Sequence, residues 1–200
     1  MATPDVTEDS AWAGINTPLS VEQLTEFCRD VERLFRINPM LEFKSFKSLG
    51  EKRYTMSGRN LSQKPPFEFD VTFKVSHLSD GLQIDYENGI KSGTTVKIES
   101  SEIGSRMTIT ETYERMPAEE REKHLGEVDK SLLNWADYLQ RFLIMWKRWH
   151  RLRPWRWYMH RVWQPMKPIG RRITYILLWI SVAEVAFIAL GAAIWFSEFS

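Results

Sequence analysis

Cysteine is nearly absent from this 200-residue chain, in which Cys28 is the only one. A single cysteine cannot form an intrachain disulfide, so nothing in the sequence favours an oxidising compartment. The first ten residues are polar and acidic, and they lack the basic and then apolar pattern of a secretory signal. The sequence therefore gives no indication of export.

Familiar catalytic and metal-binding motifs are also missing. The chain has no glycine-rich phosphate loop and no HExxH, CxxC or GxSxG motif. Its four histidines, His77, His124, His150 and His160, have no partner at the spacing of metal ligands. We therefore expect no catalytic residues, no metal and no cofactor, and we expect that the protein is not an enzyme.

Acidic residues are missing from residues 147–172, a stretch that holds nine of the 27 lysines and arginines. Residues 1–146 are acidic, with 18 basic against 24 acidic side chains, and residues 173–200 have no basic side chain. A basic block between an acidic domain and an apolar run favours a membrane surface over nucleic acid. Membrane lipids are therefore expected partners, and nucleic acid is not.

The apolar run at residues 173–196 predicts a single transmembrane helix. Its 24 residues would be about 36 Å long as a helix, enough to cross a hydrocarbon core of about 30 Å with some tilt. A buried core helix is the alternative, but such helices are usually shorter and have a polar face. Basic residues precede the run and none follows it, which predicts a single-pass protein of the inner (cytoplasmic) membrane with its N-terminal domain in the cytoplasm.

Glu184 lies near the middle of this run. A charged carboxylate is costly in lipid, so Glu184 is expected to be protonated, paired or in contact with protein. Small residues such as Ala183, Ala186 and Gly191 permit close approach of a second helix. We hypothesise that Glu184 contacts a partner membrane protein or another copy of the chain; a lone, tolerated glutamate is the alternative.

The basic stretch is also rich in tryptophan, and we call residues 147–172 the collar. Tryptophan rings and arginine side chains are both typical of the lipid headgroup region, and Trp155, Met159 and Val162 form a short apolar stripe at helical spacing. Stacking of single-stranded nucleic acid on the aromatic rings is the competing interpretation. The residues predicted at the membrane interface are Trp149, Arg153, Trp155, Arg156, Trp157, Arg161, Trp163, Arg171 and Arg172.

The N-terminal part alternates between helical and strand patterns. Ser20 and Gln23 form a capping box, so a helix is expected from Val21 to the Asn38-Pro39 stop. A strand is expected before it at residues 11–17, and about six strands after it, the clearest at residues 67–75. A long helix is expected from about Pro117 to Trp146, with an apolar stripe at Leu125, Val128, Leu132, Trp135, Ala136, Leu139, Phe142 and Leu143.

This order resembles a known superfamily. The stretches TPLSVEQLTEFCRDVERLFRINPML, FEFDVTFKVSHLSDGLQIDYENG and RMTITETYERMPAEER are similar in pattern to the START-like helix-grip, or SRPBCC and polyketide-cyclase-like, superfamily over residues 11–146. The resemblance implies an α+β fold, in which a curled antiparallel sheet of about seven strands grips the long helix. It also implies a cavity for lipids, sterols, quinones or polyketides. The anchor and collar lie outside the superfamily's common pattern.

The cavity candidates are the side chains expected on the concave face, namely Tyr54, Met56, Phe69, Phe73, Tyr86, Glu111 and Tyr113. Such residues are more often core than pocket, so the pocket is an implication of the resemblance. Glu111 would be a polar anchor for a ligand, or would lie in water at the open end of its strand. As a catalytic acid or base it would need a second positioned group, which the sequence does not show.

Two functions fit this organisation. The first is a non-catalytic, membrane-anchored START-like module that binds a hydrophobic molecule (lipid or quinone) at the cytoplasmic membrane surface. The second is a structural accessory subunit of a larger membrane complex, docked through its transmembrane helix and collar to another integral membrane protein. A cyclase or hydrolase is the third and weakest. The expected division is a tail (1–10), a START-like domain (11–146), the collar (147–172), a transmembrane helix (173–196) and a second tail (197–200).

Overall fold

The computed structural model describes the backbone of residues 10–115 and 118–199, and the side chains of residues 10–115 and 131–197. Its contacts divide the chain into two compact units, residues 1–165 and residues 166–200. The predicted stripe residues Leu125 and Val128, and His124, lie outside the described side chains. The start predicted at Pro117 and most of the predicted N-terminal tail also lie outside the described residues.

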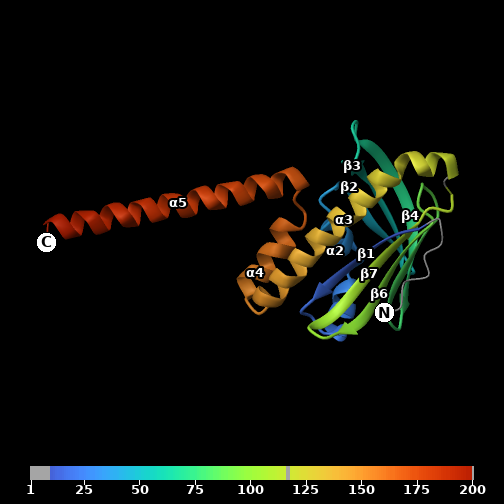
Figure 1. Ribbon diagram of the computed structural model, residues 1–200, viewed down its shortest axis with the longest axis horizontal. Coiled ribbons are helices and arrows are strands. Elements are labelled where there is room, and N and C mark those ends of the chain that lie inside the picture. Colours follow the sequence, from blue (N-terminus) through green and yellow to red (C-terminus); the bar gives the residue numbers. More distant parts are fainter. Residues whose placement is uncertain (1–9, 116–117, 200) are drawn as a thin grey trace. The chain divides into compact units, whose positions relative to one another are not determined.

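The first unit is built on a seven-stranded antiparallel sheet in the order β1-β7-β6-β5-β4-β3-β2 (Figure 1). The strands are β1 (Ser10–Thr17), β2 (Leu41–Gly50), β3 (Arg53–Asn60), β4 (Phe67–Leu78), β5 (Gly81–Tyr86), β6 (Gly93–Ser101) and β7 (Gly104–Thr112). Strands β2 to β7 pair with one another in chain order, and β1 pairs with the edge of β7 that does not pair with β6. The α+β fold predicted from the alternating pattern is confirmed.

Two short helices stand where the sequence predicted one. Helix α1 (Val21–Cys28) starts at Ser20, whose capping box with Gln23 is formed as expected. Helix α2 (Val31–Arg36) starts after Asp30, whose carboxylate accepts a hydrogen bond from the backbone N–H of Arg33 at 3.0 Å. The expected continuous helix is therefore wrong, because the Asp30 side chain caps a new helix in the middle of a continuous apolar pattern.

The long helix α3 (Ala118–Trp149) packs along the sheet, with its closest strand contacts to β1 (Figure 1). Trp135 lies at the centre of the core and donates from its indole Nε1 to the Leu34 carbonyl at 3.2 Å. Its ring stacks on Phe35 at a centroid distance of 5.7 Å. The described part of the predicted stripe is buried, at Leu132, Trp135, Ala136, Leu139, Phe142 and Leu143.

Helix α4 (Arg153–Tyr158) and the π-helical turn η1 (Met159–Trp163) complete the first unit. Pro154 occupies the first turn of α4, where its missing N–H costs nothing. Met159 is buried in the domain core, and Trp155, Tyr158 and Trp163 pack against that core. The first compact unit therefore extends to residue 165 and includes most of the collar, whereas the sequence placed the edge of the domain at residue 146.

The second unit consists mainly of helix α5 (Pro168–Phe199). Residues Pro168–Ser197 are long and apolar enough to cross a membrane, and none of the apolar window is buried. The helix starts five residues earlier than the predicted span, so Arg171 and Arg172 belong to its first turns rather than to a separate segment. Large apolar side chains along it are exposed, among them Ile176, Leu177 and Trp179.

Candidate functional site

A buried carboxylate stands at one end of the concave face of the sheet. Glu111, near the end of β7, is only 3% exposed. Its Oε2 accepts a hydrogen bond from the Tyr113 hydroxyl at 2.6 Å, and its Oε1 accepts one from the Lys91 ammonium. The Lys91 ammonium also lies 5.9 Å from the centre of the Tyr113 ring. Both carboxylate oxygens therefore have a donor, which is what allows a charged group to be buried here.

A second polar pair adjoins the first. Thr94 on β6 is the register partner of Glu111 and is fully buried. Its hydroxyl lies 3.3 Å from that of Tyr86 on β5. Burial raises the pKa of the Tyr86 phenol, and the nearby Glu111 carboxylate raises it further. The Tyr86 phenol is protonated at physiological pH even with its ordinary pKa, and the raised pKa keeps it protonated to higher pH, so it has a hydrogen to donate. We call Tyr86, Lys91, Thr94, Glu111 and Tyr113 the polar cluster.

Aromatic rings surround the polar cluster on the concave face. Phe73 is fully buried, with its ring centre 5.6 Å from that of Tyr54 and 5.7 Å from that of Tyr86. Among the seven cavity candidates, Met56, Phe73, Tyr86, Glu111 and Tyr113 are buried, and Tyr54 and Phe69 are half-buried. The structure therefore brings all seven to the inner side of the sheet. Phe69 is the most distant of the rings: it contacts Phe43, which contacts Phe46, which in turn contacts Phe73. The alternative that Glu111 lies in water is wrong, because Lys91 and Tyr113 cover it.

The polar cluster and helix α4 lie at opposite ends of the long helix α3. The chain leaves β7 at Thr112, passes Tyr113 and enters the start of α3, so the cluster lies near the first turns of α3. Helix α4 follows the last turn of α3, which is 32 residues long and so extends about 48 Å (Figure 1). The polar end of the concave face is therefore distant from α4 within the first unit.

The collar residues fall into two groups. Trp155 and Trp163 face the domain, with ring centres 5.5 Å from Trp146 and from Phe142 respectively. The apolar stripe of Trp155 and Met159 therefore packs on protein, which corrects its assignment to lipid. Of the predicted interface residues that lie in the first unit, five have exposed side chains, namely Trp149, Arg153, Arg156, Trp157 and Arg161.

Sequence reasoning missed several residues of these sites. Lys91 and Thr94 lie on a loop and on a neighbouring strand, and only the strand register places them beside Glu111. Arg115 donates to the Tyr86 carbonyl and ties the segment after β7 to β5. Arg33 is largely buried, with its guanidinium carbon 4.3 Å from the centre of the Phe27 ring and 5.2 Å from that of Trp146. In the sequence, the only indication of the polar cluster was that Glu111 occupies an inward-facing position in the alternation of its strand.

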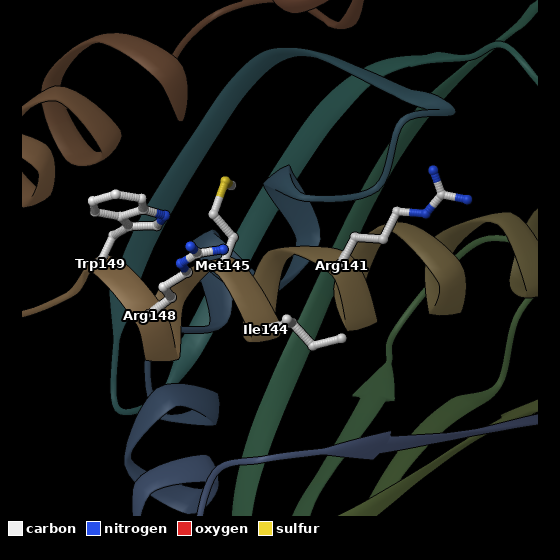
Figure 2. A pocket seen from close by; sticks show the side chains of 5 residues that line it. All are labelled: Arg141, Ile144, Met145, Arg148 and Trp149. Atoms are coloured by element: carbon white, nitrogen blue, oxygen red, sulfur yellow. The ribbon is translucent and has the colours of Figure 1, made fainter.

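A shallow hollow of about 280 Å³ lies on the outer side of α3 near its end. Figure 2 shows its lining residues, Arg141, Ile144, Met145, Arg148 and Trp149, all from this one helix. No group of three His, Cys, Asp or Glu side chains that could hold a metal occurs among the described residues. The chemistry that the described side chains offer is therefore hydrogen bonding and acid–base chemistry at the polar cluster, together with cationic and apolar contacts outside.

Comparison with solved structures identifies the fold. Similar chains include a Thermus thermophilus protein (TM-score 0.52, 15% identity, covering 66% of this chain and 94% of that one). A START superfamily protein from Mycobacterium smegmatis is also similar (TM-score 0.51, 13% identity, covering 68% and 97%). No protein-family model and no curated protein sequence matches the chain. The START-like helix-grip fold implied by the sequence pattern is confirmed for the domain, and these distant likenesses concern the fold alone.

The expectation about catalysis is corrected as well. The di-domain ARO/CYC protein StfQ from the steffimycin biosynthetic pathway matches with a TM-score of 0.49 and 8% identity, covering 67% of this chain and 50% of that one. The expectation that this protein is not an enzyme is withdrawn, because it rested only on missing motifs and a missing motif does not exclude catalysis. The missing motifs excluded only the chemistries that depend on those motifs.

Proposed function

From the START-like fold, we propose that this chain is a membrane-anchored module that binds a hydrophobic molecule, such as a lipid or quinone, at the cytoplasmic membrane surface. The observation that carries the binding proposal is the polar cluster set into an otherwise apolar concave face. Sites for small hydrophobic ligands typically combine apolar walls with a few well-placed polar groups. The cluster would supply those polar groups and the aromatic rings around Phe73 would supply the walls.

Tyr86 is the proposed ligand donor. Its hydroxyl is protonated at physiological pH, as in an unperturbed tyrosine, and its partner is the hydroxyl of Thr94, a neutral group. A carbonyl oxygen of a quinone or lipid ester would accept from Tyr86 in place of Thr94. Glu111 is less available to a ligand, because both of its oxygens already accept hydrogen bonds. In the proposed site, Glu111 therefore holds Lys91 and Tyr113 in position.

Helix α5 is the proposed anchor. Its apolar side chains are exposed, and a helix of this composition has no stable place in water. The positive charges before it and their absence after it support a cytoplasmic first unit.

Native mass spectrometry of the full chain in mild detergent tests the binding proposal. We expect one hydrophobic molecule to be retained per chain, and we expect Tyr86→Phe to retain much less of it. Gln83→Ala is the matched control, because Gln83 lies on the same strand with its side chain exposed. A wild-type chain that carries nothing, with lipids and quinones supplied, would refute the binding proposal.

Glu184 favours a second function, that of a structural accessory subunit in a larger membrane complex. Glu184 lies on the exposed helix α5, and a carboxyl group there is best explained by a polar partner in another membrane protein. We expect Glu184→Leu to lose the chains that co-purify with the wild type, while Glu184→Gln, which keeps hydrogen-bonding capacity, retains them. Equal recovery of partners with Glu184→Leu would rule this role out.

A further inference from the structure

Helix α3 has a second apolar side near its C-terminus. Leu139, Phe142 and Leu143 fill the domain core, yet Ile144 is 49% exposed and Trp149 is 40% exposed. Figure 2 shows these two side chains with Met145, Arg141 and Arg148 around the hollow on the outer side of the helix. A helix that is apolar on two sides needs cover on both of them.

Exposed apolar side chains also follow the end of α3 in the chain. Leu152 is half exposed and Trp157 is 63% exposed, whereas the neighbouring Trp155 is turned toward the domain. The exposed cations of this region are Arg148, Arg151, Arg153, Arg156 and Arg161. Within the described part of the chain, none of these five arginines has a carboxylate within 4.0 Å. The region therefore presents uncovered apolar side chains together with uncompensated positive charge.

We propose that the surface formed by Ile144, Arg148, Trp149, Arg153, Arg156 and Trp157, here called the docking face, lies on an anionic membrane surface. The inference rests on the proposed anchoring by α5 and adds a second, peripheral contact made by the first unit itself. It replaces the inward Trp155 and Trp163 of the sequence-based assignment with Ile144 and Arg148. In this contact, lipid phosphates accept hydrogen bonds from the guanidinium groups. The indole rings and aliphatic carbons enter the boundary between the headgroups and the acyl chains.

Charge selects a lipid occupant over a second copy of the chain. A symmetric dimer through the docking face would place the arginines of one copy against those of the other, which is unfavourable. Residues 147–172 contain no acidic side chain that could compensate this repulsion. An anionic bilayer would supply the missing negative charge. The docking face also lies close in sequence to α5, the proposed anchor in that bilayer.

A depth measurement on the full chain in lipid nanodiscs tests the proposal. A nitroxide is attached at Ile144→Cys, and a control nitroxide at Ile90→Cys. Ile90 is similarly exposed but lies in the loop beside Lys91, at the end of the domain opposite α4. The natural Cys28 is buried and stays unlabelled in the folded chain. Nanodiscs of phosphatidylcholine are compared with nanodiscs that also contain phosphatidylglycerol.

We expect the nitroxide at position 144 to become inaccessible to an aqueous relaxation agent only when phosphatidylglycerol is present, and the nitroxide at position 90 to stay accessible. Replacing Arg148, Arg153 and Arg156 by Gln should lower the ratio of docked to undocked chains by about 100-fold, at roughly fivefold for each arginine. Replacing the exposed lysines Lys47, Lys52 and Lys74 by Gln makes the same change in net charge and should leave the ratio unchanged.

Equal accessibility at positions 144 and 90 in phosphatidylglycerol nanodiscs would overturn the docking face. Protection at position 144 that accompanies spin–spin broadening between chains would overturn it in favour of self-association. Failure of the anchor gives a different result, because the chain would then not insert into nanodiscs at all. If the chain does not insert but still floats with phosphatidylglycerol vesicles, and the arginine variant does not float, the docking face is supported and the anchor is not. If the non-inserted wild-type chain does not float either, the docking face and the anchor are both overturned.

Discussion

At the scale of single residues, the polar cluster shows how a carboxylate is kept inside an apolar sheet. Burying Glu111 alone would cost several kcal/mol, and the Tyr113 hydroxyl and Lys91 ammonium offset that cost by donating to its two oxygens. The side chain of Lys91 remains partly exposed, so the pair spans the boundary between core and solvent. The cluster is therefore the part of the core most sensitive to loss of one partner.

Tyr113→Phe tests this sensitivity. The substitution keeps the ring but leaves the Glu111 Oε2 without its tyrosine donor, so we expect a loss of about 1–3 kcal/mol of unfolding free energy. The thermal unfolding midpoint in detergent should fall by several degrees. Tyr138→Phe is the control, because Tyr138 is exposed on α3 and its change should have almost no effect. Equal midpoints for the two variants would show that the hydrogen bond to Glu111 contributes nothing.

Cys28 gives a prediction on pH. Burial raises the pKa of its thiol from 9.0 to about 12. Because the folded-state pKa is the higher one, the stabilising contribution is complete below pH 9 and is lost as the pH rises toward 12. We expect the unfolding midpoint of the wild type to fall more steeply over this range than that of Cys28→Ala. The thiol should also react with an alkylating reagent only after denaturation, and rapid reaction of the folded chain at pH 8 would contradict the burial.

At the scale of elements, alternation of apolar and polar residues was enough to predict the sheet. The sequence of strand β4 alternates from Phe67 to Ser76, and α3 carries a clear stripe, so their positions and inward faces followed from local periodicity. The break at Asp30 did not follow, because its capping role depends on the backbone conformation around it. Pairing of Glu111 with Lys91 could not be predicted either, since 20 residues separate them and only the register brings them together.

The collar shows where sequence patterns are ambiguous. An apolar stripe such as Trp155 and Met159 suits lipid and protein equally well, so the sequence alone could not decide which side faces which. The structure directs that stripe into the domain and leaves Trp157 and the arginines outside. Some of the predicted interface residues therefore pack against the core, and the proposed membrane contact rests on the exposed ones.

Two tryptophans of the same segment separate these roles. Trp163 packs on Phe142, so Trp163→Ala should remove about 2 kcal/mol or more of stability. Trp157 is largely exposed, and Trp157→Ala should stay within about 0.5 kcal/mol of the wild type. Thermal unfolding of both variants in detergent provides the comparison. A larger loss for Trp157→Ala than for Trp163→Ala would mean that the segment packs the other way round.

At the scale of the whole molecule, the two units differ in the kind of side chain that they expose. The first unit has a buried core and an acidic balance up to residue 146, typical of a domain in water. The second has an apolar exposed helix without basic residues beyond Arg172. The proposed ligand site, docking face and partner contact at Glu184 all depend on lipid surrounding that helix.

Extraction of native membranes at high pH tests this requirement most directly. Alkaline carbonate releases peripheral proteins and leaves proteins that span the bilayer in the membrane pellet. We predict that the full chain stays in the pellet, because the docking face alone would be released while α5 is held by the hydrocarbon core. Recovery of the chain in the supernatant would contradict the account at its centre.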